Sequence, residues 1–421
     1  MLDLRFIREN PDLVKAGIAR KNEKADIDDI LELDRKRREI IREVEQLKAG
    51  RNKMSADIAA RKKDGQPADD AIAEMRRVGQ QIASLDSDLR EVEKEFKTSL
   101  SWVPNLPHES VPVGTDENAN DLVREWGEKP SRDFKVLPHW EIGEKLGILD
   151  LPAAARISGS GFYVLRGLGA RLERALANYM LDLHVADGFI EYSPPFIVTA
   201  DTMYGTGQLP KLDEDMYHTE PDGLYLIPTA EVPLTNVFKG EIISHEMLPI
   251  GMVAYTPCFR REAGAAGKDT RGMMRVHQFA KVEMVRIVRP ENSYDELESL
   301  LRQAEKVVRG LGLPYRVMNL ASGDLSFASA KTYDIELWAA GIEKYLEISS
   351  VSNFEDFQAR RMNCRFRDED KSVKFPHTLN GSGVALARLV PAILENYQNA
   401  DGTVTVPEIL KPYMGGVDRI G

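Results

Sequence analysis

The amino-acid sequence predicts an α+β fold: a mainly antiparallel sheet core with helices, preceded by a long antiparallel α-helical coiled-coil hairpin. Apolar residues recur at alternating spacings of three and four over residues 28–98, which indicates two helices packed along one seam. Prolines at positions 104, 107 and 112 then end the helical pattern. Strand and helix patterns alternate beyond them. We therefore expect one domain at residues 1–103 and a second at residues 104–421.

The hairpin is predicted from two runs of seam residues around a breaker, Gly65-Gln66-Pro67. The seam residues are Leu33, Ile40, Val44, Leu47, Met54 and Ile58 in the first helix and Met75, Val78, Ile82, Leu85, Leu89, Val92 and Phe96 in the second. Arg37 and Arg51 also fall on the seam. At 1.5 Å per residue each helix would extend roughly 45–50 Å. Because heptads describe how helices pack and not what they bind, a dimerisation coiled coil stays an alternative.

Composition narrows the class of protein. The formal net charge of −11 argues against non-specific nucleic-acid binding by the whole surface, although a local basic patch is still possible. No stretch approaches the roughly 18 apolar residues of a membrane helix. The first residues are charged and lack the apolar stretch of a secretory signal. Two cysteines, Cys258 and Cys364, exclude a disulfide scaffold. We expect a cytoplasmic protein with no membrane contact.

The helices and strands of the second domain are predicted from the hydrophobic pattern of each segment. Helices are expected at residues 172–185, 294–310 and 383–397. Strands are expected at residues 189–198, 251–262, 273–288 and 345–350, and a glycine-rich loop at residues 263–267 joins two of them. Strands joined by hairpins, with the helices set apart from them, favour a mainly antiparallel sheet.

Polar residues gather on one face of the expected hairpin at residues 251–288. Alternate residues of a strand share a face, which groups Arg260 with Glu262 and also groups Arg275, His277, Phe279, Lys281 and Glu283. A solvated sheet face could carry the same residues. The glycine-rich turn and the phenylalanine among charges favour a site, where Phe279 could stack on a planar base and the arginines could bind phosphates.

A second group of residues lies nearer the C-terminus. Asn380-Gly381-Ser382-Gly383 is expected to open a helix whose first turns carry Arg388. Arg388 stands among apolar residues, where an unpaired charge would be costly. The sequence therefore predicts a buried partner or a ligand phosphate for its guanidinium.

These segments together resemble the class II aminoacyl-tRNA synthetases. Residues 188–197 resemble their motif 1, residues 260–279 their motif 2, and residues 380–388 their motif 3. Thr229-Ala230-Glu231, Phe279 through Glu283 and Glu347-Ile348-Ser349-Ser350 are similar to segments of the bacterial type of the seryl-tRNA synthetase family. The hairpin resembles that family's arm for tRNA, and the resemblance covers essentially the whole chain in order.

The resemblance implies substrates and site residues. It implies activation of serine with ATP, with Mg²⁺ bound by Glu347 and Ser350, and transfer of the seryl group to the 3′ end of tRNA. Arg260 and Arg388 would be catalytic. ATP would be bound by Arg260, Arg261, Glu262, Arg275, Val276, Phe279, Glu347, Ile348, Ser349, Ser350 and Arg388. Serine would be bound by Thr229, Ala230, Glu231, Arg260, Glu283, Asn380 and Ser382.

The same resemblance implies partners. It implies tRNA(Ser), with tRNA(Sec) as a further substrate, and a homodimer across which the tRNA is held. Basic residues of the hairpin are candidate tRNA contacts: Arg35, Lys36, Arg37, Arg38, Arg51, Lys53, Arg61, Lys62 and Lys63. Two other interpretations stay open. One is a synthetase-like ligase that charges a carrier protein, for which a shortened or missing hairpin is expected, and the other is an inactive coiled-coil scaffold.

Overall fold

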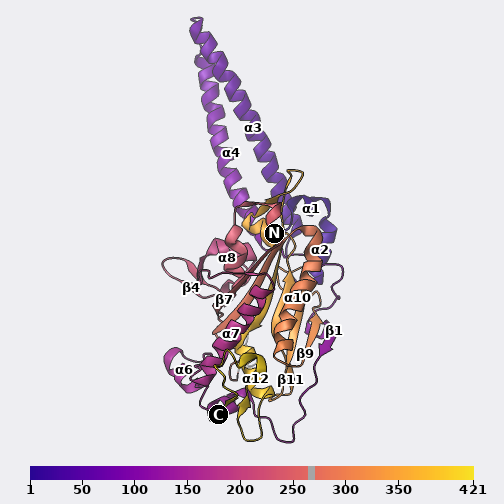
Figure 1. Ribbon diagram of the computed structural model, residues 1–421. Coiled ribbons are helices and arrows are strands. Elements are labelled where there is room, and N and C mark those ends of the chain that lie inside the picture. The colour runs from indigo at the N-terminus through magenta and orange to yellow at the C-terminus, as the bar shows by residue number, and fades with distance from the viewer. Residues whose placement is uncertain (264–270) are drawn as a thin grey trace. The chain divides into compact units, whose positions relative to one another are not determined.

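The computed structural model describes residues 1–263 and 271–421 (Figure 1). The chain forms two compact units. One comprises residues 3–19 and 24–104, and the other comprises residues 1–2, 20–23 and 105–421. No helix within the described residues is both long enough and apolar enough to cross a membrane.

The helical unit contains the predicted hairpin. Its helices are α1 (Leu4–Glu9), α2 (Pro11–Arg20), α3 (Ile27–Lys63) and α4 (Asp69–Ser101), and Figure 1 shows α3 and α4 side by side. The seam buries Val44, Ile58, Val78, Ile82, Val92 and Phe96. Arg37 takes its seam position by stacking its guanidinium 5.3 Å from the ring centre of Phe96. At the base of the arm, Arg8 binds the fully buried Asp34 through two hydrogen bonds of 2.8 Å.

The other unit is built on one large sheet. Among the described residues it has eight strands in the order β1-β9-β10-β11-β14-β8-β7-β2. These are β1 (Asp121–Trp126), β2 (Ile190–Glu191), β7 (Ile250–Phe259), β8 (Gln278–Val288), β9 (Tyr315–Asn319), β10 (Lys331–Ala339), β11 (Lys344–Asn353) and β14 (His377–Ala385). Every neighbouring pair is antiparallel except β2 with β7. The predicted fold class is therefore confirmed.

Short sheets and helices complete this unit. The small strands are β3 (Ile197–Thr199), β4 (His218–Thr219), β5 (Leu224–Leu226), β6 (Ile242–Ser244), β12 (Arg365–Arg367), β13 (Val373–Lys374), β15 (Val404–Thr405) and β16 (Arg419–Ile420). The helices are α5 (His139–Lys145), α6 (Leu151–Ser158), α7 (Leu168–Ala186), α8 (Ala200–Thr206), α9 (Glu231–Thr235), α10 (Ser293–Gly310), α11 (Phe357–Met362) and α12 (Leu386–Asn396).

The two faces of the large sheet have different surroundings. Helices α7, α10 and α12 cover one face (Figure 1), where Val282 and Met284 of β8 join the main hydrophobic core. On the other face Val285 and Ile287 pack in a second core that includes Ala230 and Leu234. Lys281 and Glu283 share this second face because strand residues alternate. The predicted alternation along β8 is confirmed.

Three strand predictions are wrong in extent, those at residues 189–198, 251–262 and 273–288. The expected strand at residues 189–198 is two short strands, β2 and β3, in different sheets. Pro194 and Pro195 lie between them and have no N–H for a ladder hydrogen bond. β7 ends at Phe259 and β8 begins at Gln278, so Arg260, Glu262, Arg275 and His277 lie outside the strands. Glu262 has a φ of 51°, which is incompatible with a continuing strand. Of the glycine-rich loop, residues 264–267 lie outside the described residues.

The prediction for Asn380-Gly381-Ser382-Gly383 is also wrong, because this segment belongs to β14 and the helix begins only at Leu386. The strand is irregular here. Ser382 pairs with Glu283 and Val384 with Val282, which leaves Gly383 as an extra residue. A side chain at Gly383 would lie 3.0 Å from both His184 and Val282. Glycine therefore permits the close packing of β14 on its neighbours, and does not open a helix.

Candidate active site

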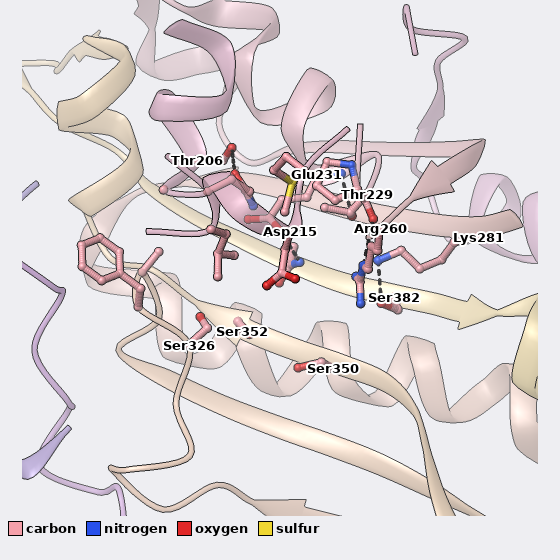
Figure 2. Close-up of a pocket in the computed structure, with 18 of the residues that line it drawn as sticks. Thr206, Asp215, Thr229, Glu231, Arg260, Lys281, Ser326, Ser350, Ser352 and Ser382 are labelled. Atoms are coloured by element: carbon pink, nitrogen blue, oxygen red, sulfur yellow. Dashed lines mark hydrogen bonds between the residues drawn. The ribbon is translucent and has the colours of Figure 1, made fainter. Parts of the chain in front are cut away.

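A cavity of about 620 Å³ lies over the ends of β7 and β8 and the middle of β11 and β14. Predicted site residues line it from several separate segments (Figure 2). These are Thr229, Glu231, Arg260, Glu262, Arg275, Glu347, Ser350, Asn380 and Ser382. Figure 2 shows Arg260, Lys281 and Ser382 grouped together, with Ser326, Ser350 and Ser352 along another side. The structure thus brings together predicted residues that lie far apart in the sequence, such as Thr229 and Ser382, which are 153 positions apart.

A second cavity of about 90 Å³ continues from the first. Both are lined by Arg260, Glu262, Arg275, Lys281, Glu347 and Ser382. The smaller cavity adds Val276, Phe279, Ile348 and Arg388, which were all predicted to bind ATP. The guanidinium of Arg260 lies 5.2 Å from the ring centre of Phe279, and Arg275 pairs with Glu262 at 3.2 Å.

Four predicted residues line neither cavity. Ala230 is fully buried in the core against β8, and Glu283 is fully buried behind the cavity surface. Ser349 donates a hydrogen bond of 2.5 Å to the carbonyl of Ser382. The guanidinium of Arg261 donates to the carbonyl of Glu214 at 3.1 Å. Glu283 and Ser349 still touch the site through neighbours that line it, namely Asn380 and Ser382.

Two buried carboxylates lie at the floor of the larger cavity: Glu231 lines it, and Glu283 lies directly behind it. Asn380 Nδ2 donates to Glu231 Oε2 and to Glu283 Oε1, each at 3.1 Å. Gln358 Nε2 donates to Glu231 Oε1 at 2.7 Å. Burial, reinforced by the negative charge of Glu283, raises the pKa of Glu231 to about 7. The buried Oδ1 of Asn380 has no donor among the described residues, so it remains available as an acceptor.

Lys281 is part of the same floor, although no role was predicted for it. Its ammonium forms an ion pair with Glu283 and donates to Ser382 Oγ at 3.2 Å. The alternation of β8 placed Lys281 on the face of Phe279 and Glu283, which was the signal in the sequence. Its contact with Ser382 could not be predicted, because it depends on how β14 pairs with β8.

A β-bulge brings the two predicted Mg²⁺ ligands to one side. Glu336 of β10 pairs with Glu347, and Ile335 pairs with Ser349, so Ile348 is an extra residue in β11. In a regular strand, Glu347 and Ser350 would point to opposite faces because they are three positions apart. The bulge brings both to one side, where they line the larger cavity. A carboxylate and a hydroxyl are hard oxygen ligands and fit Mg²⁺, which keeps water and phosphate oxygens for the rest of its shell.

The electrostatics of Glu347 also fit a cation site. Burial alone would raise its pKa, but the charges of Arg388 and Arg260 outweigh that effect and lower the pKa below its usual value. Arg388 lies 3.3 Å from the Glu347 carboxylate and donates to the Glu347 carbonyl. The partner of Arg388 is therefore Glu347, but it is not buried as the sequence predicted, because its side chain is 47% exposed and faces the cavity.

One end of the larger cavity was not predicted from the sequence. It is lined by Thr206, Gln208, Ser326, Phe327, Ser352 and Phe354. The loop around Ser326 is held by Lys21, whose ammonium donates to the carbonyls of Ser326, Phe327 and Ser329 at 2.7, 3.1 and 2.8 Å. These residues belong to no motif, and only the tertiary structure brings them to the site.

The antiparallel sheet, the two cavities and the arginines that line them define the core of a class II aminoacyl-tRNA synthetase. A family model described as "tRNA synthetase class II core domain (G, H, P, S and T)" matches residues 215–397. A second model, "Seryl-tRNA synthetase N-terminal domain", matches residues 1–107.

Individual relatives show which family of class II synthetases the chain belongs to. The chain is 54% identical to a serine–tRNA ligase from Thermodesulfovibrio yellowstonii over 99% of both chains. It is 56% identical to one from Caldicellulosiruptor saccharolyticus, again over 99% of both. The crystal structure of seryl-tRNA synthetase from Pyrococcus horikoshii complexed with ATP matches with a TM-score of 0.93 and 40% identity, covering 100% of this chain and 99% of that one. This chain is therefore an enzyme of the seryl-tRNA synthetase family.

Proposed function

We propose that this enzyme joins serine to tRNA(Ser) in two steps at the paired cavities. Serine and ATP first form seryl-adenylate and pyrophosphate, and the seryl group then passes to the 3′ end of the tRNA. The observation that carries the proposal is the continuity of the cavities: a carboxylate-lined pocket with Glu231 and Asn380 opens into an arginine-lined one with Arg388. Relatives named serine–tRNA ligase, matched over the whole chain, support it.

The first step needs positioning more than acid–base chemistry. The carboxylate of serine is already ionised and attacks the α-phosphorus, while the bond from that phosphorus to the bridging oxygen breaks and pyrophosphate leaves. We propose that Arg260 bridges the serine carboxylate and the α-phosphate. Arg388 would stabilise the negative charge that develops on the leaving pyrophosphate. Mg²⁺, when held by Glu347 and Ser350, supplies further charge compensation at the phosphates.

ATP would be held by both side chains and backbone groups of the predicted residues. We propose that Phe279 stacks on adenine and that Glu262 accepts from its amino group, with Arg275 holding Glu262. The proposed ATP binding is supported by the ATP complex of the archaeal relative. Arg261, Val276, Ile348 and Ser349 would contribute mainly backbone contacts.

Serine would lie on the carboxylate floor. We propose that Thr229, Glu231, Glu283 and the free Oδ1 of Asn380 receive its ammonium group. Glu283 and Ser382 would receive its hydroxyl, and Ala230 would hold the backbone of this pocket. Alanine would leave the buried Glu283 and Ser382 short of one donor, so it should be rejected strongly.

Replacement of Glu283 by glutamine is expected to impair the use of serine far more than that of ATP. A hydrogen bond to a charged group contributes about 1.5–3 kcal/mol, so the KM for serine should rise about tenfold to a hundredfold. The KM for ATP should change less than about threefold. Steady-state pyrophosphate exchange measures both values. Phe279→Leu is the matched control and should give the reverse pattern. Equal losses for both substrates in Glu283→Gln would contradict the assignment.

The decisive experiment is pyrophosphate exchange with a panel of amino acids, followed by charging of total tRNA. Exchange that depends on serine and charging of tRNA(Ser) are expected. Transfer to a carrier protein in place of tRNA would favour the carrier-ligase alternative, and no exchange with any amino acid would overturn the proposal in favour of a scaffold. Charging of a tRNA(Sec) transcript in the same assay tests our extension to that substrate.

For the helical unit we propose a tRNA-binding domain at residues 1–103, with residues 104–421 as the catalytic domain. Several candidate tRNA contacts are already in ion pairs, namely Arg35, Arg37, Arg38 and Arg61. Lys36, Arg51, Lys53, Lys62 and Lys63 form no ion pair with any of the described residues. These five would contact the RNA backbone, as expected for recognition of double-stranded RNA by shape.

We also propose a homodimer. Large apolar side chains are exposed near the segment that resembles motif 1: Val185, Ile190, Phe196, Ile197 and Tyr255. β2, which carries Ile190, is the last strand of the large sheet, so a second copy could cover this edge. Light scattering should give a mass of about twice the 47.3 kDa of one chain. A single-chain mass at micromolar concentration would contradict this proposal.

A further inference from the structure

The carboxylate of Glu283 accepts from donors of the protein itself at both of its oxygens. Asn380 Nδ2 donates to its Oε1 at 3.1 Å. Its Oε2 forms an ion pair with Lys281 and accepts from Ser382 Oγ at 3.5 Å. The side chains of Glu283 and Lys281 are 0% and 7% exposed. Because an uncompensated buried charge is strongly destabilising, these donors stabilise the buried carboxylate.

The donors on Oε2 have the chemistry of the substrate. Lys281 provides an ammonium group and Ser382 a hydroxyl, and the two are hydrogen-bonded to each other at 3.2 Å (Figure 2). Free serine carries the same pair, an ammonium group and a hydroxyl. A carboxylate has about four acceptor positions, so Glu283 has little capacity left for two further donors. A substrate that binds Glu283 must therefore compete with Lys281.

The ammonium group of Lys281 has a second possible position, in the smaller cavity. It lines both cavities, and the smaller one also contains the guanidinium groups of Arg260 and Arg388. We have proposed that the phosphates of ATP lie there. An ammonium group released from Glu283 would meet negatively charged phosphate oxygens within the same buried space.

We infer that Lys281 is a switching residue that couples the two substrate pockets. It occupies Glu283 in place of the serine ammonium while the pocket is empty, and it turns to the phosphates of ATP when serine takes its position. The inference rests on the proposed function and deepens it. Binding of ATP would draw Lys281 away from Glu283 and so remove the competitor of serine. Binding of serine would release Lys281 and so give ATP a further partner. Serine and ATP should therefore bind with positive cooperativity. Linkage requires the effect to be equal in both directions.

The coupling can be measured without catalysis. The probe is an ATP analogue with a methylene bridge between the α- and β-phosphates, which cannot form the adenylate. Titration calorimetry gives the Kd for serine with and without saturating analogue. In the unaltered protein, serine should bind at least about fivefold more tightly when the analogue is present. In Lys281→Met the ratio should fall to about one. Phe279→Leu is the control: it should weaken the analogue but keep the ratio once the analogue saturates.

A ratio of one in the unaltered protein, or an unchanged ratio in Lys281→Met, would overturn the inference. If Lys281→Met fails to fold, a crystal structure of the unaltered protein with serine and the analogue decides. Lys281 Nζ within about 4 Å of a phosphate oxygen supports the switch, whereas Lys281 still paired with Glu283 overturns it. Serine-dependent pyrophosphate exchange with a ratio of one would refute only the coupling, whereas absence of exchange would refute the proposed function as well.

Discussion

Removal of the outer part of the helical arm is expected to abolish tRNA charging and to leave serine-dependent pyrophosphate exchange intact. The cut is best made at residues 48–86, joined by a short glycine-serine turn, because Lys48 and Asp86 face each other across the hairpin at 3.5 Å. This deletion keeps the Arg8–Asp34 ion pair and the stacking of Arg37 on Phe96 at the base.

The physical reason is the division between the two units. Every residue that lines the two cavities belongs to the unit of residues 105–421, so their chemistry should survive. The deletion removes four of the five basic residues proposed to contact RNA, and the kcat/KM for tRNA should fall at least about a hundredfold. Exchange should stay within about twofold of the unaltered enzyme.

Point variants test the same division more finely. Lys62→Ala combined with Lys63→Ala removes two charges that have no ion pair in the described part of the chain, and charging should become weaker and less sensitive to salt. Arg77 is paired with Glu74 at 2.7 Å, so Arg77→Ala is the control with a smaller expected effect. Loss of exchange in a folded deletant would contradict the division, and undiminished charging would favour a dimerisation coiled coil.

Replacement of Arg388 by alanine is expected to slow adenylate formation about tenfold to a hundredfold, as the loss of one charged group at a leaving group typically does. In the structure its guanidinium is fixed by both the carboxylate and the carbonyl of Glu347. The variant would therefore remove the proposed charge stabilisation of pyrophosphate, and it also removes the main cation that keeps the pKa of Glu347 low. Pre-steady-state measurement of pyrophosphate release gives the rate.

Arg289→Ala is the matched control for this variant. Arg289 has a similarly buried side chain, 23% exposed against 27% for Arg388, and it pairs with Asp368 and Glu369 outside both cavities. Its replacement should leave the rate of adenylate formation within about twofold. If Arg388→Ala kept the full rate at saturating ATP and Mg²⁺, Arg388 would have no role in the chemical step.

The predicted features that depend on local periodicity agree with the structure. The seam of the arm follows from spacings of three and four, and the polar face of β8 follows from alternation at Lys281 and Glu283. Arg260 and Glu262 were predicted in the site for a reason that is wrong, since they follow the strand and do not lie within it. Arg260 and Glu262 reach the cavity from the loop after β7 just as they could have done from a strand.

The features that could not be predicted depend on pairing between distant segments. The extra residues Ile348 and Gly383 are visible only once β11 and β14 are aligned with their partners. Ser326 and Phe327 enter the site because Lys21, some 300 positions earlier, binds the carbonyls of their loop. No pattern within a short window carries that information.

The bulge at Ile348 makes this part of the enzyme more tolerant of a shorter strand than of a longer one. Glu347 and Ser350 are three positions apart and share a side of the strand only because the bulge absorbs one residue. Deleting Ile348 would leave them two positions apart in a regular ladder, still on one side. Inserting one residue between them would turn one of the two proposed oxygen ligands away from the cavity, while the sheet itself could still form.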